Sequence, residues 1–258
     1  TLSQSHRVPK AIHFLAEKVA RRIHRRFPKK YKARDTLGVV SRIDSVNSIT
    51  MDDGSWLIMS QAGYTLNPVT ADLRGLGYLF TYRGHRSIST SITTAVNGWN
   101  RLREGDEVSG EVAKKIYSYM SLNTRVKRGF KKLTGILDDE FMTLSVLQER
   151  CGLLATENME WFDAMDKLPE LDRAYILKLL RKGEDFNKPP RITVSTIHGA
   201  KGGEADNVVL FTDLSPAAEE DMRINPDDMH RVFYVGVTRT KDKLYIVDAD
   251  QADRSYDL

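Results

Sequence analysis

A glycine-rich stretch near the end of the chain offers groups suited to phosphate chemistry. A β-branched run, Ile192 to Ile197, leads directly into His198-Gly-Ala-Lys-Gly-Gly-Glu204. Glycines let the backbone approach a ligand closely, and polar groups at the carboxyl end of a strand lie where α/β sheets bind ligands. Taken alone, the pattern is also that of an ordinary structural turn.

A second block, Arg231 to Lys241, predicts a helix that ends in polar residues. Its apolar residues are spaced along a helix, and Thr-Arg239-Thr-Lys follows them. An arginine has a planar fork that can grip two phosphoryl oxygens, and its charge does not titrate. Arg239 is therefore suited to phosphate chemistry; the alternative is a surface arginine at a helix end.

The two blocks together resemble motifs of a known family. Thr196-Ile-His-Gly-Ala-Lys-Gly-Gly-Glu204 resembles motif V, and Tyr234-Val-Gly-Val-Thr-Arg-Thr-Lys241 resembles motif VI, of the UvrD/Rep/PcrA family of superfamily-1 DNA helicases. They stand in the family's order and spacing. One departure is Gly203, where the family usually has Leu.

The resemblance implies roles for individual residues. Thr196, His198 and Lys201 would lie on the side of single-stranded DNA. Gly203 and Glu204 would lie on the ATP side, with Glu204 at the sugar. Arg239 would be the arginine finger that reaches the γ-phosphate across a domain interface, a role typically worth about 10³–10⁵ in rate.

The beginning of the chain supplies a third match. Leu2-Ser-Gln-Ser-His-Arg7 resembles motif IV, Leu-x-Gln-Asn-Tyr-Arg. The resemblance implies that Arg7 is a second γ-phosphate contact and that Gln4 and His6 belong to the ATP site. The family's Tyr stacks on adenine, and the imidazole of His6 can stack with less area and a pH-sensitive charge.

The sequence contains no Gly-x-x-x-x-Gly-Lys-Ser/Thr loop. The resemblance therefore implies an ATP site shared with an N-terminal RecA-like domain of the same parent chain, which would also hold Mg²⁺. The parent would be an ATP-dependent helicase that moves single-stranded and duplex DNA. We expect these 258 residues alone to show no ATPase activity, and the absence of an initial Met predicts a fragment of a longer chain.

Alternating strand and helix signals favour a parallel α/β sheet of the RecA-like type. Helical patterns dominate the middle of the chain, which predicts a small all-helical insertion subdomain. We predict two parts of the RecA-like domain, residues 1–97 and 191–258, on either side of an insertion at 98–190. Within the insertion, helices are expected near 108–120, 125–133, 143–154, 158–168 and 169–182; earlier in the chain, one is expected at 9–27.

Composition sets limits on other classes of protein. A hydrophobic content of 41% and a charged content of 29% are ordinary for a soluble globular chain. The single cysteine, Cys151, excludes a disulfide framework and cysteine-based zinc sites, and the six histidines show no metal-binding spacing. We therefore predict no metal site in this chain and a cytoplasmic location.

Positive charge is concentrated in two segments. Residues 1–35 hold eleven Lys or Arg residues and two acidic ones, and residues 125–132 hold five basic residues and no acidic one. Such blocks attract nucleic acid, although a solvated helix face is the ordinary alternative.

Two other functions stay open at this point. The basic segments suit a nucleic-acid-binding module without motor activity. The chain could also be an inactive helicase-like scaffold for protein interactions, although a scaffold would have no need of both Arg7 and Arg239.

Overall fold

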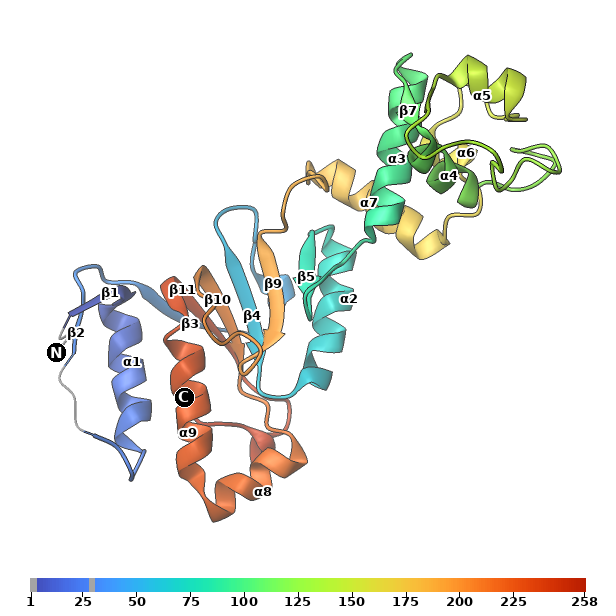
Figure 1. Ribbon diagram of the computed structural model, residues 1–258. Helices are drawn as coiled ribbons and strands as arrows, with labels where there is room; N and C mark the ends of the chain where they lie inside the picture. The colour runs from blue at the N-terminus through green and yellow to red at the C-terminus, as the bar shows by residue number, and fades with distance from the viewer. Residues whose placement is uncertain (1–3, 28–30) are drawn as a thin grey trace. The chain divides into compact units, whose positions relative to one another are not determined.

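The computed structural model describes residues 4–27 and 31–258 (Figure 1). The chain divides into two compact units. The sheet unit consists of the residues up to Ser87 together with Pro189–Leu258, and the insertion unit is Ile88–Lys188.

A seven-stranded sheet forms the centre of the sheet unit, with the strand order β3-β11-β10-β4-β9-β5-β6. Every neighbouring pair is parallel except β5 and β6. The strands are β3 (Val39–Ile43), β4 (Trp56–Ser60), β5 (Phe80–Tyr82), β6 (His85–Arg86), β9 (Ile192–Thr196), β10 (Ala205–Phe211) and β11 (Thr240–Val247). The predicted α/β class with a mostly parallel sheet is confirmed.

Both faces of this sheet are buried, which explains why its central strands have continuous apolar sequences. In β4, Leu57 and Met59 face one hydrophobic core, and Trp56 and Ile58 face the other. The first core is covered by α1 (Lys10–Arg21), α8 (Pro216–Ile224) and α9 (Pro226–Val237). The second is covered by α2 (Leu66–Leu76), which ends at Gly77 with a φ of 74°.

Near the start of the chain, β1 (Gln4–Pro9) and β2 (Lys32–Arg34) form a small parallel pair. In this pair β1 lies beside β11. Helix α1 follows β1 directly and packs against α9 (Figure 1).

Helix α1 ends at Arg21, so the predicted helix over 9–27 is too long. The cause is Asp227 on α9, whose carboxylate accepts hydrogen bonds from the backbone N–H groups of His24 (2.8 Å) and Arg25 (2.9 Å). These bonds fix the turn that follows the helix.

The insertion unit is mainly helical. It contains α3 (Thr90–Arg103), α4 (Gly110–Ser118), α5 (Leu144–Arg150), α6 (Trp161–Ala164) and α7 (Glu170–Lys182), with one short antiparallel pair, β7 (Val108–Ser109) and β8 (Phe141–Met142). The structure places the unit boundaries after Ser87 and Lys188, whereas we predicted them after 97 and 190. The first differs because α3 is continuous and packs on α4 within this unit.

The helix predicted over 125–133 is wrong, because this segment consists of turns. Gly129 and Leu133 have positive φ values of 95° and 47°, which a right-handed helix cannot accommodate. The ammonium of Lys131 instead binds the carbonyl oxygens of Tyr117 (2.5 Å), Ser118 (3.1 Å) and Met120 near the end of α4. One of the five basic residues of this segment is therefore a structural cap.

Candidate functional site

Four charged residues from distant parts of the sequence meet at one edge of the sheet unit. The carboxylate of Glu204 lies 3.2 Å from Nη1 of Arg7 through Oε2 and 2.8 Å from Nζ of Lys241 through Oε1. Nη1 of Arg239 donates a hydrogen bond of 3.2 Å to the carbonyl oxygen of Gly203, next to Glu204. We call Arg7, Glu204, Arg239 and Lys241 the arginine–glutamate cluster.

The starts of two neighbouring strands position this cluster. Glu204 immediately precedes β10 and Arg239 immediately precedes β11, and Ala205 is the register partner of Thr240. The N–H of Ala205 donates to the carbonyl oxygen of Arg239 at 3.1 Å. The backbone therefore holds Glu204 and Arg239 close together, and β1 brings Arg7 to them.

The guanidinium of Arg239 is held by main-chain oxygens. Besides the bond to Gly203, its Nε donates to the carbonyl oxygen of Val235 in α9 at 3.2 Å. Burial, followed by the like charge of Arg7, lowers the pKa of Arg239 from its usual value. An anion binding beside Arg239 would relieve this repulsion.

The cluster has more positive than negative charge. Three cations surround one carboxylate, and hydrogen bonds from Lys241 and then Arg7 hold the pKa of Glu204 below its usual range. Within the part of the chain that the structure describes, the buried Nε of Arg7 has no hydrogen-bond partner. A buried donor without a partner is costly, so the cluster is suited to an added anion such as a phosphate group.

Two other residues predicted for the ATP side lie apart from these contacts. The side-chain amide of Gln4 donates to the carbonyl oxygen of Ala33 at 2.7 Å and thereby fastens β1 to β2. His6 is exposed on β1.

Of the residues predicted for the DNA side, Thr196 lies at the opposite end of the strands. Thr196 is the last residue of β9 and the register partner of Ser60, the last residue of β4. Its Oγ1 accepts a hydrogen bond of 3.0 Å from the N–H of Gly199. His198 and Lys201 follow in the loop and are exposed.

One glycine-rich loop, residues 197–204, therefore connects the two groups of predicted site residues. Ile197 and Ala200 are buried in the core beneath α9, which anchors the loop. Only its first part lies where strands end. Glu204 lies immediately before the start of β10. The sequence pattern was interpreted as a single ligand-binding loop and did not predict this position of Glu204.

Lys241 is a member of the cluster that we did not predict as a site residue. Its hydrogen bond to Glu204 raises the pKa of Lys241. The available signal was its place two residues after Arg239, which puts both side chains at the start of one strand.

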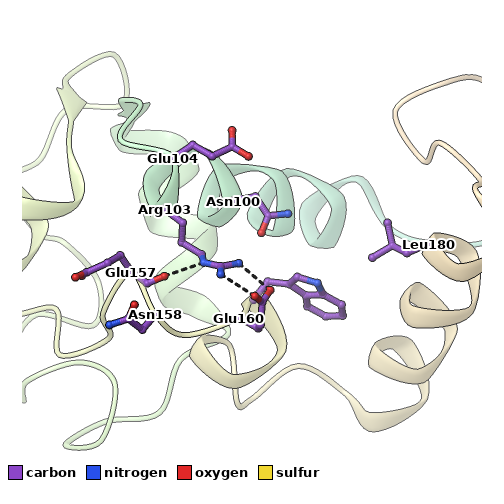
Figure 2. Close-up of a pocket in the computed structure, with 8 residues that line it drawn as sticks. Asn100, Arg103, Glu104, Glu157, Asn158, Glu160 and Leu180 are labelled. Atoms are coloured by element: carbon purple, nitrogen blue, oxygen red, sulfur yellow. Dashed lines mark hydrogen bonds and ion pairs between the residues drawn. The ribbon is translucent and has the colours of Figure 1, made fainter.

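A separate pocket of about 580 Å³ lies within the insertion unit. Figure 2 shows Arg103 bound to Glu160, through two hydrogen bonds of 2.7 Å each, and to the carbonyl oxygen of Glu157 at 2.9 Å. The pocket contains none of the predicted site residues.

In the described ranges, 4–27 and 31–258, no group of three or more His, Cys, Asp or Glu side chains could hold a metal ion. No helix there is long and apolar enough to cross a membrane.

A mostly parallel sheet covered by helices on both faces and interrupted by a mainly helical unit defines the class of the protein as a RecA-like α/β domain. The family model of the UvrD-like helicase C-terminal domain matches residues 113–251, more than half of the chain, and the protein belongs to this family. The matched segment includes the loop 197–204 and Arg239 but not β1. No curated protein sequence matches the chain.

Proposed function

We propose that this domain completes the ATP site of a DNA helicase motor and supplies part of its track for single-stranded DNA. The observation that carries the proposal is the meeting of Arg7, Glu204 and Arg239 from opposite ends of the sequence. The excess of positive charge and the unpartnered Nε of Arg7 among the described residues support a phosphate ligand at this edge.

In this proposal each residue of the cluster has a separate task. Arg239 and Arg7 bind the γ-phosphate of ATP and stabilise the charge that develops as the phosphoryl group leaves. Glu204 contacts the sugar, and Gly203 fixes Arg239 through its carbonyl oxygen. Gln4 and His6 complete the ATP side, where the imidazole of His6 would stack on the adenine.

The residues that bind Mg²⁺ and cradle the phosphates would come from an N-terminal RecA-like domain of the same parent. The cluster itself suits an anion better than a metal ion, because its one carboxylate already binds Arg7 and Lys241. ATP between the two domains would draw them together through Arg7 and Arg239.

The DNA side of the proposal rests on Thr196, His198 and Lys201. His198 and Lys201 are exposed on a loop whose ends are fixed by β9 and β10. Thr196 lies at the carboxyl end of β9. The loop therefore offers polar and positively charged groups to single-stranded DNA that passes over this end of the strands.

The test is the Arg239→Ala variant in a protein that joins this chain to its N-terminal RecA-like domain. We expect the rate of ATP hydrolysis to fall by about 10³–10⁵ while nucleotide binding stays largely intact. Arg223→Ala is the matched control, because Arg223 is an exposed arginine that pairs, among the described residues, with Glu219 and Glu220 on its own helix. Unchanged turnover in Arg239→Ala would remove the arginine-finger assignment.

A further inference from the structure

The outward side of helix α1 carries an unusual combination of an exposed aromatic ring and positive charge. The inward side is fixed in the core through Ile12, Ala16 and Val19, which are at most 3% exposed. On the other side, Phe14 is 74% exposed. Lys18 and Arg21 are exposed on the same stripe, one and two turns further along the helix.

Several cations on and just after this helix have no acidic partner among the residues that the structure describes. Lys18, Arg25 and Arg26 form no ion pair within the described ranges 4–27 and 31–258, and all three are exposed. Arg21 pairs with Glu17 at 3.6 Å, a contact between exposed side chains that contributes little. We call Phe14, Lys18 and Arg21 on α1, together with Arg25 and Arg26 in the turn that follows it, the α1 basic surface.

This surface differs from a protein-docking face. The core of a protein interface is apolar and depleted of charged residues, whereas here four exposed cations lie in the sequence between two exposed rings, Phe14 at 74% and Phe27 at 90%. A ring left in water beside positive charge suits a ligand with flat bases and a negatively charged backbone. Single-stranded nucleic acid has both features, because bases stack on aromatic rings and phosphates pair with Lys and Arg.

The α1 basic surface is distinct from the loop that carries Thr196 and His198. Helix α1 packs against α9 and β3. Strands β11, β10 and β4 separate β3 from β9 in the sheet, so β3 and β9 are about 19 Å apart at about 4.8 Å per strand. Single-stranded nucleic acid bound on α1 would therefore occupy a second binding site on the domain, separate from the loop with Thr196 and His198.

We propose that the α1 basic surface binds single-stranded nucleic acid, with Phe14 stacking on a base and Lys18, Arg25 and Arg26 contacting phosphates. This proposal does not depend on ATP binding at the arginine–glutamate cluster. It predicts binding by the chain in the absence of nucleotide.

The first experiment measures binding of a fluorescent oligothymidylate by anisotropy at several salt concentrations. Phe14→Ala should weaken binding about tenfold without changing the salt dependence, because it removes stacking alone. The triple variant Lys18→Ala/Arg25→Ala/Arg26→Ala should lower the slope of log K against log salt by about 2, at about 0.7 per phosphate contact.

Matched controls come from the insertion unit. Phe141 is 63% exposed, so Phe141→Ala removes a comparable ring, and Lys178→Ala/Arg181→Ala/Lys182→Ala removes three positive charges from α7. Both controls should bind like the parent chain. Thermal denaturation of every variant establishes that it is folded, which we expect because the substituted side chains of the α1 basic surface are exposed.

Three results would overturn the proposal. Parent-like binding by Phe14→Ala would remove the stacking contact. An equal loss of slope in the α7 triple variant would show that net charge alone drives binding. Tighter binding of a duplex of the same length, with no effect of Phe14→Ala, would exclude a single-strand surface. Running His198→Ala/Lys201→Ala in parallel separates this surface from the loop.

Discussion

At the scale of single residues, Glu204 is the centre of the candidate site. Its two oxygens bind different cations, Lys241 and Arg7, so neither cation is gripped by both oxygens. Without Lys241, the Glu204 carboxylate could form a bidentate ion pair with Arg7, the geometry that arginine favours. Lys241 thus leaves much of the Arg7 fork available for another ligand.

This arrangement predicts the effect of Lys241→Met. The hydrogen bond from Lys241 is the largest cause of the low pKa of Glu204, so the pKa should rise toward its usual value in the variant. A ¹³C NMR titration of the Glu204 carboxyl measures the change. Lys243→Met, on the same strand, is the control and should leave the titration as it is in the parent. An unchanged pKa of Glu204 in Lys241→Met would contradict the ion pair between Lys241 and Glu204.

At the scale of elements, Asp227 joins the start of α9 to the turn after α1. Its bonds to the N–H groups of Arg25 and His24 lower its pKa to about 2. A carboxyl whose pKa is lower in the folded state stabilises the fold at pH values above its usual pKa of 3.8, and this contribution is lost as the pH falls through about 2.

The Asp227→Asn variant tests this pH dependence. Its melting temperature should be lower than that of the parent at pH 7, and the difference should shrink between pH 4 and pH 2 as the parent loses the charge of Asp227. Calorimetry at a series of pH values measures both. A constant difference over that range would mean that the charge of Asp227 does not support the turn.

Two helical glycines make a second test at this scale. A Cβ on Gly98 of α3 would lie 2.3 Å from Cγ1 of Val112 in α4, whereas a Cβ on Gly75 of α2 would meet nothing within 4 Å. We expect Gly98→Ala to cost about 1–3 kcal/mol and Gly75→Ala to stabilise by about 0.5–1 kcal/mol. Denaturant unfolding measures both.

The companion variant Gly98→Ala/Val112→Ala removes the atom in the way. If close packing of α3 on α4 is the reason for Gly98, the double variant should cost less than the sum of the two single changes. Simple additivity would show that Gly98 is present for another reason.

At the scale of the whole molecule, the insertion unit leaves and re-enters the sheet unit at nearby points. The N–H of Ser87 donates to the carbonyl oxygen of Phe80 at 2.8 Å, and Ile192 is the register partner of Phe80 on the other side. Two strand spacings, about 10 Å, therefore separate Ser87 from Ile192.

This closeness predicts that the insertion can be removed. A chain in which four Gly or Ser residues replace 88–188 should fold, because four residues span about 13 Å. The ¹H–¹⁵N NMR spectrum should keep the signals of the sheet unit, including those of β4, β9 and β10. Loss of those signals would show that the sheet unit depends on the insertion for its stability.

The sequence predicted some of these features and not others. The buried strands β4 and β10 were predictable because they are apolar on both faces. The segment 125–133 was not, because its basic residues resemble an exposed helix face while Gly129 and the cap made by Lys131 determine its path. The family resemblance placed Arg7, Glu204 and Arg239 in one site. The place of Lys241 two residues after Arg239 indicates that both lie at the start of β11, but it does not reveal that Glu204 precedes the strand paired with β11.

Helices α1 and α9 are joined at both ends. At one end Asp227 holds the turn after α1, and at the other Glu204 holds Arg7, just before α1, while Gly203 holds Arg239, just after α9. Each helix has 12 residues, so the two ties stand about 18 Å apart. Because contacts at both ends connect the two helices, they oppose rotation of α1 against α9. A force on Arg7 or Arg239 is therefore transmitted to both helices together.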